Sequence, residues 1–228
     1  MKINLVANIG SLESLILGSK VEDIIKKVDK LEFVDAIVLR INSDCDVSLL
    51  EEIRNYIYQK KILCGISVND VESAKTAISV SADYIKISSS RCNHMELINY
   101  ISKNFLRKVH ISTGMTTRLE RNNIINRNNS FVIYCCTSNY DDTGYVFVEK
   151  KLGFSCNNSD MFYGQAAILN GAKWVEYHMD SDKQIKEFYS LKKWINLNLK
   201  RLSRIQCRKP YHLPVGELSA RKMYWSVA

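Results

Sequence analysis

Hydroxyl, amide and basic side chains gather where short β-branched runs of the sequence end. The segments are ISSSR (87–91), STGM (112–115), CTSNY (136–140), FSCNN (154–158) and EYHM (176–179). Clustered hydroxyls and backbone amides, with Lys86 just before the first segment, suit a phosphate or a carboxylate. The alternative interpretation is that these hydroxyls only satisfy backbone groups at the strand ends.

Lys86 and the pair Glu176 and His178 carry the charged chemistry of these segments. Lys86 ends a buried run, where an ammonium needs an anion, either a ligand or a structural partner such as Glu176. Glu176 and His178 are two residues apart on a strand and therefore share a face. They form either a weakened metal site with Asn157 or a hydrogen-bonded pair.

The elements that must position these residues alternate along the chain. Amphipathic helical patterns separate the strands, each strand–helix unit averaging about 28 residues, which predicts a single (β/α)8 TIM barrel over residues 1–205. A doubly wound open sheet is the alternative, but no glycine-rich nucleotide motif follows any strand. The predicted strands are Ile3–Asn8, Ala36–Ile41, Ile62–Val68, Tyr84–Ser88, Val109–Thr113, Phe131–Cys136, Leu152–Cys156 and Trp174–His178.

Local signals refine this pattern. Asp70 and Ser48 are predicted helix N-caps. The asparagine-rich segment 121–130 is predicted to be a polar loop, and 139–151 shows no clean helical period. Cys135, Cys136 and Cys156 are expected to pack in the core.

Composition restricts the function classes. The chain has no apolar run long enough for a bilayer and no signal-peptide pattern, so we expect a cytoplasmic protein whose seven cysteines are reduced. Residues 191–228 hold nine basic residues and one acid, which equals the whole net charge of +8. We therefore expect a basic C-terminal helix and a basic tail over 206–228. Without an aromatic platform or reader motif, nucleic acid is not an expected partner.

The order of the later strands and their residue sequences resemble those of the N-acetylneuraminate (sialic acid) synthase family. The similar segments are ADYIKISSS, VHISTGMTTRLE, YCCTSNYDDT and the stretch from LGFSCNN to EYHM. The segment ELSARKMYWSVA resembles the family's link to a C-terminal antifreeze-like domain, which is not expected here because the chain stops there.

The resemblance implies a function and a set of residues. Family members condense phosphoenolpyruvate with an amino-sugar aldehyde that a divalent metal, manganese or magnesium, makes electrophilic. The positions that resemble the family's phosphoenolpyruvate pocket are Lys86, Ser89, Ser67, Ser138 and Ser155. The family's two metal histidines fall on His178 and Asn157, and an amide oxygen is a weak replacement for imidazole.

Other family positions have changed. The family's first glutamate falls on Asn8, its acid after strand four on Arg91, and its strand-two lysine on Val38. The remaining catalytic candidates are His178, Glu176 and Arg91, and a bound metal is doubtful.

Two functions follow from the resemblance. One is an enzyme that binds phosphoenolpyruvate or a related anion and joins it to an amino-sugar acceptor. The other is a barrel without turnover that acts as a partner or regulator in sugar-acid biosynthesis. A homo-oligomer or a partner protein is compatible with both.

Overall fold

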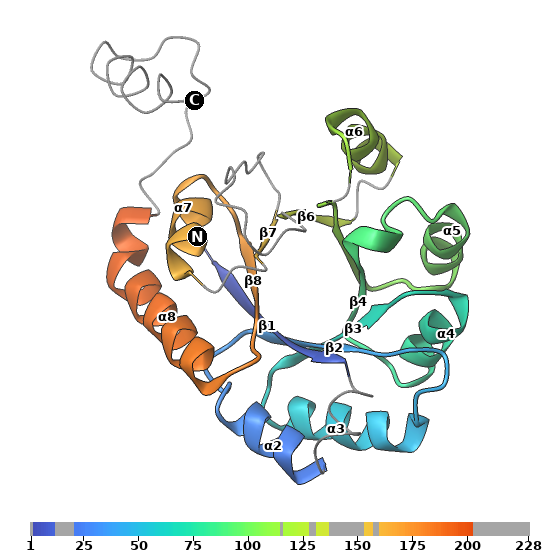
Figure 1. Ribbon diagram of the computed structural model, residues 1–228, viewed down its shortest axis with the longest axis horizontal. Helices are drawn as coiled ribbons and strands as arrows, with labels where there is room; N and C mark the ends of the chain where they lie inside the picture. Colours follow the sequence, from blue (N-terminus) through green and yellow to red (C-terminus); the bar gives the residue numbers. More distant parts are fainter. Residues whose placement is uncertain are drawn as a thin grey trace.

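The computed structural model of the chain describes residues 2–11, 21–114, 116–127, 131–136, 153–156 and 160–202. Eight parallel strands close into a barrel in the order β1 to β8, and helices surround it (Figure 1). The strands are β1 (Asn4–Ser11), β2 (Ala36–Arg40), β3 (Leu63–Val68), β4 (Tyr84–Ile87), β5 (Lys108–Ser112), β6 (Val132–Cys136), β7 (Gly153–Cys156) and β8 (Trp174–His178).

The described helices follow the strands in the expected alternation. They are α2 (Val21–Asp29), α3 (Val47–Gln59), α4 (Val71–Ser79), η1 (Ser89–Arg91), α5 (Met95–Asn104), α6 (Arg118–Arg127), α7 (Met161–Leu169) and α8 (Asp182–Leu202). None of these helices is long and apolar enough to span a bilayer.

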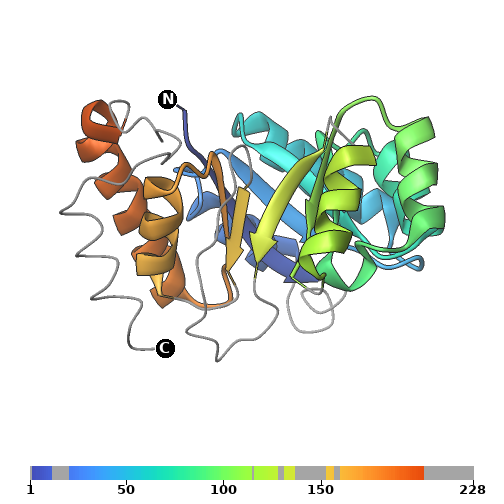
Figure 2. The ribbon, with the colours of Figure 1, turned by 90° about the horizontal axis from the view of Figure 1, so that it is seen from above.

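Closure of the barrel depends on the pairing of its last and first strands. Trp174 to His178 lie in parallel register with Asn4 to Asn8. This register confirms the predicted closed barrel and excludes an open sheet with two free edges. Because all strands run the same way, their carboxyl ends meet at one end of the barrel, which we call the mouth (Figure 2).

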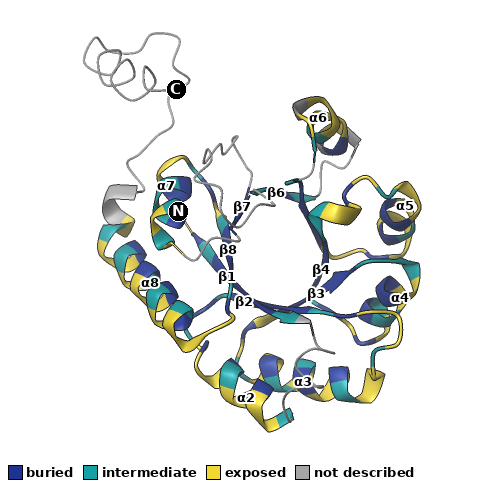
Figure 3. Ribbon diagram, in the orientation of Figure 1, coloured by how far each residue is buried: buried dark blue, intermediate teal, exposed yellow. Residues whose placement is uncertain are grey.

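Two apolar cores lie on opposite faces of the strands. The larger core fills the space between the strands and the helices, and includes Ile37, Leu39 and Ile111. The smaller one lies inside the barrel and includes Val6, Val38 and Tyr84. Alternating residues of one strand thus enter different cores, which is why the strands read as continuous apolar runs and appear buried in Figure 3.

An aromatic layer closes the barrel interior below the mouth. Tyr84 stacks on His110 with their ring centroids 4.2 Å apart, and Trp174 packs edge-on to the same imidazole. The Tyr134 hydroxyl lies 2.9 Å from His110 Nδ1. Gly65 makes room for this layer, because a Cβ atom there would overlap the Tyr84 ring.

Two local predictions were wrong. The N-cap of α3 is Asp46, which accepts from the Leu49 N–H, while the predicted cap Ser48 donates its hydroxyl to Asp46. Residues 121–127, predicted to be loop, belong to α6. That helix lacks an apolar stripe, but Thr117 and Glu120 form a reciprocal capping box that starts it. The predicted cap of α4, Asp70, is confirmed. Residues 128–130, 139–151 and 203–228 lie outside the described residues.

Candidate anion site at the mouth of the barrel

Strand alternation decides which side chains face the barrel interior. On β2, Ala36 and Val38 belong to the inner core, so Arg40, two residues further, also faces inward at the mouth. The same alternation on β8 turns Glu176 and His178 inward, which confirms that they share the interior face. Further inward side chains near the mouth, among the described residues, include those of Asn8, Ser67, Lys86 and Ser155.

Lys86 and Glu176 form a buried ion pair across the barrel. The ammonium contacts Glu176 Oε1 directly, and both side chains are almost fully buried. Asn8 Nδ2 donates to the same carboxylate oxygen at 3.1 Å, and Ser155 Oγ donates to it at 3.3 Å. The structural partner proposed for Lys86 from the sequence is therefore confirmed as Glu176.

The environment of Glu176 keeps its carboxylate charged. Burial by itself would raise the pKa of Glu176, but the charges of Lys86 and His178 and the hydrogen bonds from Lys86 and Asn8 lower it. Its second oxygen, Oε2, is buried without a hydrogen-bond partner among the described residues. An unpaired buried carboxylate oxygen is costly, so this atom is the natural acceptor for a water molecule or a ligand hydroxyl.

His178 lies at the mouth end of β8, in register with Asn8. Burial lowers the pKa of His178, the nearby Glu176 raises it, and Lys86 and Arg40 lower it, with a net decrease. The imidazole is therefore neutral near pH 7. No hydrogen bond links His178 to Glu176, so the predicted His–Glu hydrogen-bonded pair is not formed.

The described donors do not fit a divalent metal. Within the described ranges, no three His, Cys, Asp or Glu side chains come together in a way that could hold one. Glu176 is engaged by the Lys86 ammonium, which would compete with a cation, and leaves His178 as the remaining strong donor. Asn157 lies outside the described residues.

Ser89 connects three strand ends at the mouth. Its hydroxyl oxygen accepts from the Gly114 N–H at 3.2 Å and lies 3.0 Å from Cys136 Sγ. Cys136 is therefore half-buried at the mouth, in contrast to the predicted core position, which Cys135 and Cys156 do occupy. Arg91, at the end of the η1 turn, is exposed. Ser138 lies outside the described residues.

Sequence reasoning missed two residues that face the interior. Arg40 lies in the predicted strand Ala36–Ile41, two positions after Val38, so the alternation rule already indicated an inward guanidinium. The other missed residue is His110, for which no role was predicted from the sequence. It is fully buried, and burial lowers the pKa of His110 to about 3. The signal for His110 was its place on an inward position of a buried strand.

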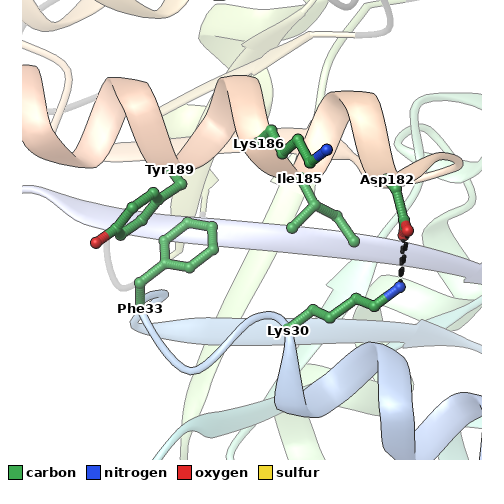
Figure 4. Close-up of a pocket in the computed structure, with 6 residues that line it drawn as sticks. All are labelled: Lys30, Phe33, Asp182, Ile185, Lys186 and Tyr189. Atoms are coloured by element: carbon green, nitrogen blue, oxygen red, sulfur yellow. Dashed lines mark hydrogen bonds and ion pairs between the residues drawn. The ribbon is translucent and has the colours of Figure 1, made fainter.

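A separate groove lies on the outside of the barrel, between α8 and the segment that follows α2 (Figure 4). Its floor is apolar, with Phe33, Ile185 and Tyr189, and the Lys30–Asp182 ion pair at 2.8 Å closes one side. The groove shares no residue with the mouth and is not considered part of the candidate site.

Comparison with known proteins identifies the family. Residues 29–205 match the model of the NeuB family, and the chain belongs to this family. No curated protein matches the chain.

Solved structures support the same fold. The chain is similar to the N-acetylneuraminic acid (sialic acid) synthetase of Leptospira borgpetersenii in complex with citrate, with a TM-score of 0.75 and 15% identity, over 99% of this chain and 92% of that one. It is also similar to the spore coat polysaccharide biosynthesis protein spsE of Bacillus subtilis, with a TM-score of 0.73 and 19% identity, over 88% and 70% of the two chains.

Proposed function

We propose that this barrel binds phosphoenolpyruvate or a related anion at its mouth and joins it to an amino-sugar aldehyde in sugar-acid biosynthesis. The observation that carries the proposal is the match to the NeuB family over 29–205, combined with a cationic and hydroxyl-lined mouth. The solved neighbour from Leptospira was obtained in complex with citrate, a small polyanion. In a barrel of this kind the carboxyl ends of the strands carry the active site.

The proposed reaction assigns a task to each part of the mouth. The nucleophilic carbon of phosphoenolpyruvate forms a bond to the aldehyde carbon, whose oxygen takes up a proton. Water then adds to the resulting cationic carbon, and inorganic phosphate leaves. Lys86, Ser67, Ser89 and Ser155, with Ser138 from outside the described residues, are proposed to line the anion pocket. The neutral His178 and the free oxygen of Glu176 are available to move or accept protons.

The steps proposed above assign tasks only to side chains of this chain. The proposed acceptor is accordingly one that binds through charge. Arg91 is exposed beside the β4 end of the mouth and would attract a carboxylated or phosphorylated sugar.

Anion binding is tested first, without turnover. Phosphoenolpyruvate, phosphate and sulfate are expected to raise the thermal midpoint of the wild-type protein. Lys86→Ala should remove most of that shift, because it deletes a cation and leaves the Glu176 carboxylate facing the ligand. Equal shifts in the two proteins would contradict the proposed pocket.

Turnover is tested by phosphate release in a coupled assay. We predict little or no release from phosphoenolpyruvate with plain N-acetylmannosamine as acceptor, with or without manganese, and higher release with a more anionic amino sugar. Robust turnover of N-acetylmannosamine that is lost in His178→Ala would show that the ordinary family reaction operates here.

A second function is favoured by one specific observation. Lys86, the cation of the proposed pocket, is already neutralised by Glu176. A barrel whose interior charges satisfy each other can keep the fold without catalysis and act as a partner or regulator in the same biosynthesis. The two functions differ in the phosphate-release assay, where the second predicts no turnover with any acceptor.

A further inference from the structure

Arg40 is an inward-facing cation at the mouth that forms no ion pair with a described residue. It ends β2 in register with Ser67 of β3, which is itself in register with Lys86 of β4. The side chain therefore enters the mouth beside the Lys86–Glu176 pair but from a different strand.

The described surroundings of Arg40 do not balance its charge. Within them its Nε is buried without a hydrogen-bond partner, and no carboxylate forms an ion pair with it. Glu176 is engaged by Lys86, Asn8 and Ser155. His178 is near enough for the Arg40 charge to lower its pKa, but a neutral imidazole does not balance a guanidinium.

Arg40 is half-buried, so part of its guanidinium remains open to a ligand. Its buried Nε, with no hydrogen-bond partner among the described residues, costs free energy that an oxyanion could recover. Among the described residues, the Lys86–Glu176 pair is neutral overall, so Arg40 supplies the net positive charge of this part of the mouth.

We infer that Arg40 is the principal anion-binding residue of the mouth and takes a carboxylate or phosphate group of the ligand. Lys86 then acts mainly as a positioning residue, which holds Glu176. This inference rests on the proposed function and names the residue that selects its substrate class. A guanidinium offers a planar fork of donors that matches either oxyanion, whereas the Lys86 ammonium is already occupied.

The experiment measures binding of phosphoenolpyruvate, inorganic phosphate and pyruvate by calorimetry to four proteins. These are the wild type, Arg40→Gln, Arg40→Lys and the control Arg107→Gln. Arg107 precedes β5 at the opposite end of the barrel, where it donates to the carbonyls of Ser81 and Ala82. The control therefore removes the same unit of charge away from the mouth.

We expect Arg40→Gln to weaken phosphoenolpyruvate binding roughly 10- to 100-fold, as for the loss of charge-assisted hydrogen bonds. Arg40→Lys should retain part of the affinity, and Arg107→Gln should bind like the wild type. Inorganic phosphate represents the phosphate end of phosphoenolpyruvate, and pyruvate represents its carboxylate end. Only the compound whose anionic group contacts Arg40 should lose affinity in Arg40→Gln.

The unliganded stability of the variant is an independent readout. Because Arg40 has no ion-pair partner among the described residues, Arg40→Gln should unfold at the same temperature as the wild type or a higher one. A lower midpoint would reveal a structural partner and overturn the inference. Unchanged phosphoenolpyruvate affinity in Arg40→Gln would overturn it too, while leaving the proposed function intact. Absence of binding by the wild type would overturn both.

Discussion

At the scale of single residues, the mouth is organised by one buried ion pair and the hydrogen bonds around it. Lys86 and Glu176 are ninety residues apart in the chain and meet inside the barrel. A buried pair of this kind need not stabilise the protein relative to an apolar pair of the same shape. Removal of one partner is different, because it leaves the other charge buried alone.

This difference gives a prediction for the pair. Lys86→Met and Glu176→Gln should each lower the free energy of unfolding by about 3–5 kcal/mol, and the double variant should cost clearly less than the sum of the two. Urea denaturation of the three variants measures these values. The exposed pair Lys75–Glu72 provides the control, since Lys75→Met should change stability little. Additive effects of the two buried substitutions would show that the side chains do not interact energetically.

At the scale of elements, glycines on two strands make room for aromatic rings on their neighbours. Gly65 on β3 faces Tyr84 on β4, and Gly153 on β7 faces Tyr134 on β6, where an added Cβ would lie 2.7 Å from the Tyr134 ring. The two tyrosines, together with His110 and Trp174, fill the barrel below the mouth. At these positions, the pairing of two strands therefore depends on a glycine that leaves space inside the barrel for its neighbour's ring.

The coupling is tested at Gly65. Gly65→Ala should destabilise the protein by about 1–3 kcal/mol, because the Tyr84 ring must leave its place on His110. Tyr84→Leu frees that space, so Gly65→Ala should cost less in the Tyr84→Leu background than in the wild type. Thermal or urea unfolding of the two single variants and the double variant gives the comparison. An equal cost in both backgrounds would mean that the ring is not the obstacle.

At the scale of the whole molecule, closure of the barrel removes imidazoles from water. Burial lowers the pKa of His110 from its ordinary value of 6.5 to about 3, and it also lowers the pKa of His178. Below pH 6.5 the unfolded chain takes up protons that the folded barrel does not. The stability contributed by the neutral histidines is therefore complete above pH 6.5 and decreases as the pH falls toward 3.

The predicted consequence is that the free energy of unfolding begins to fall at a pH above the range in which carboxylates take up protons. Each such histidine should contribute up to about 1.4 kcal/mol of lost stability per pH unit below pH 6.5. Urea midpoints measured between pH 7.5 and 5 should fall in the wild type and fall less steeply in His110→Phe. The same pH dependence in both proteins would contradict the assignment of His110 as a buried neutral group.

The sequence by itself determined the strands and their alternation and predicted the closed barrel, and the pairing of β1 with β8 then confirmed closure. Each described strand begins and ends within three residues of the predicted bounds, because runs buried on both faces leave a clear apolar pattern. The family followed from segments between residues 82 and 182 and is confirmed by the match over 29–205. The inward faces of Glu176 and His178 also followed, since a strand turns every second side chain to the same side.

Only the tertiary structure decided what these inward residues contact. A sequence leaves Lys86 with either a ligand or a structural partner, and the choice depends on which strand lies across the barrel from β4. The helical state of 121–127 was missed for a different reason, because the segment has no apolar stripe and its one local signal was the capping box of Thr117 and Glu120. What holds for Lys86 also holds for Arg40, because only the positions of its described neighbours show that none of them balances its charge.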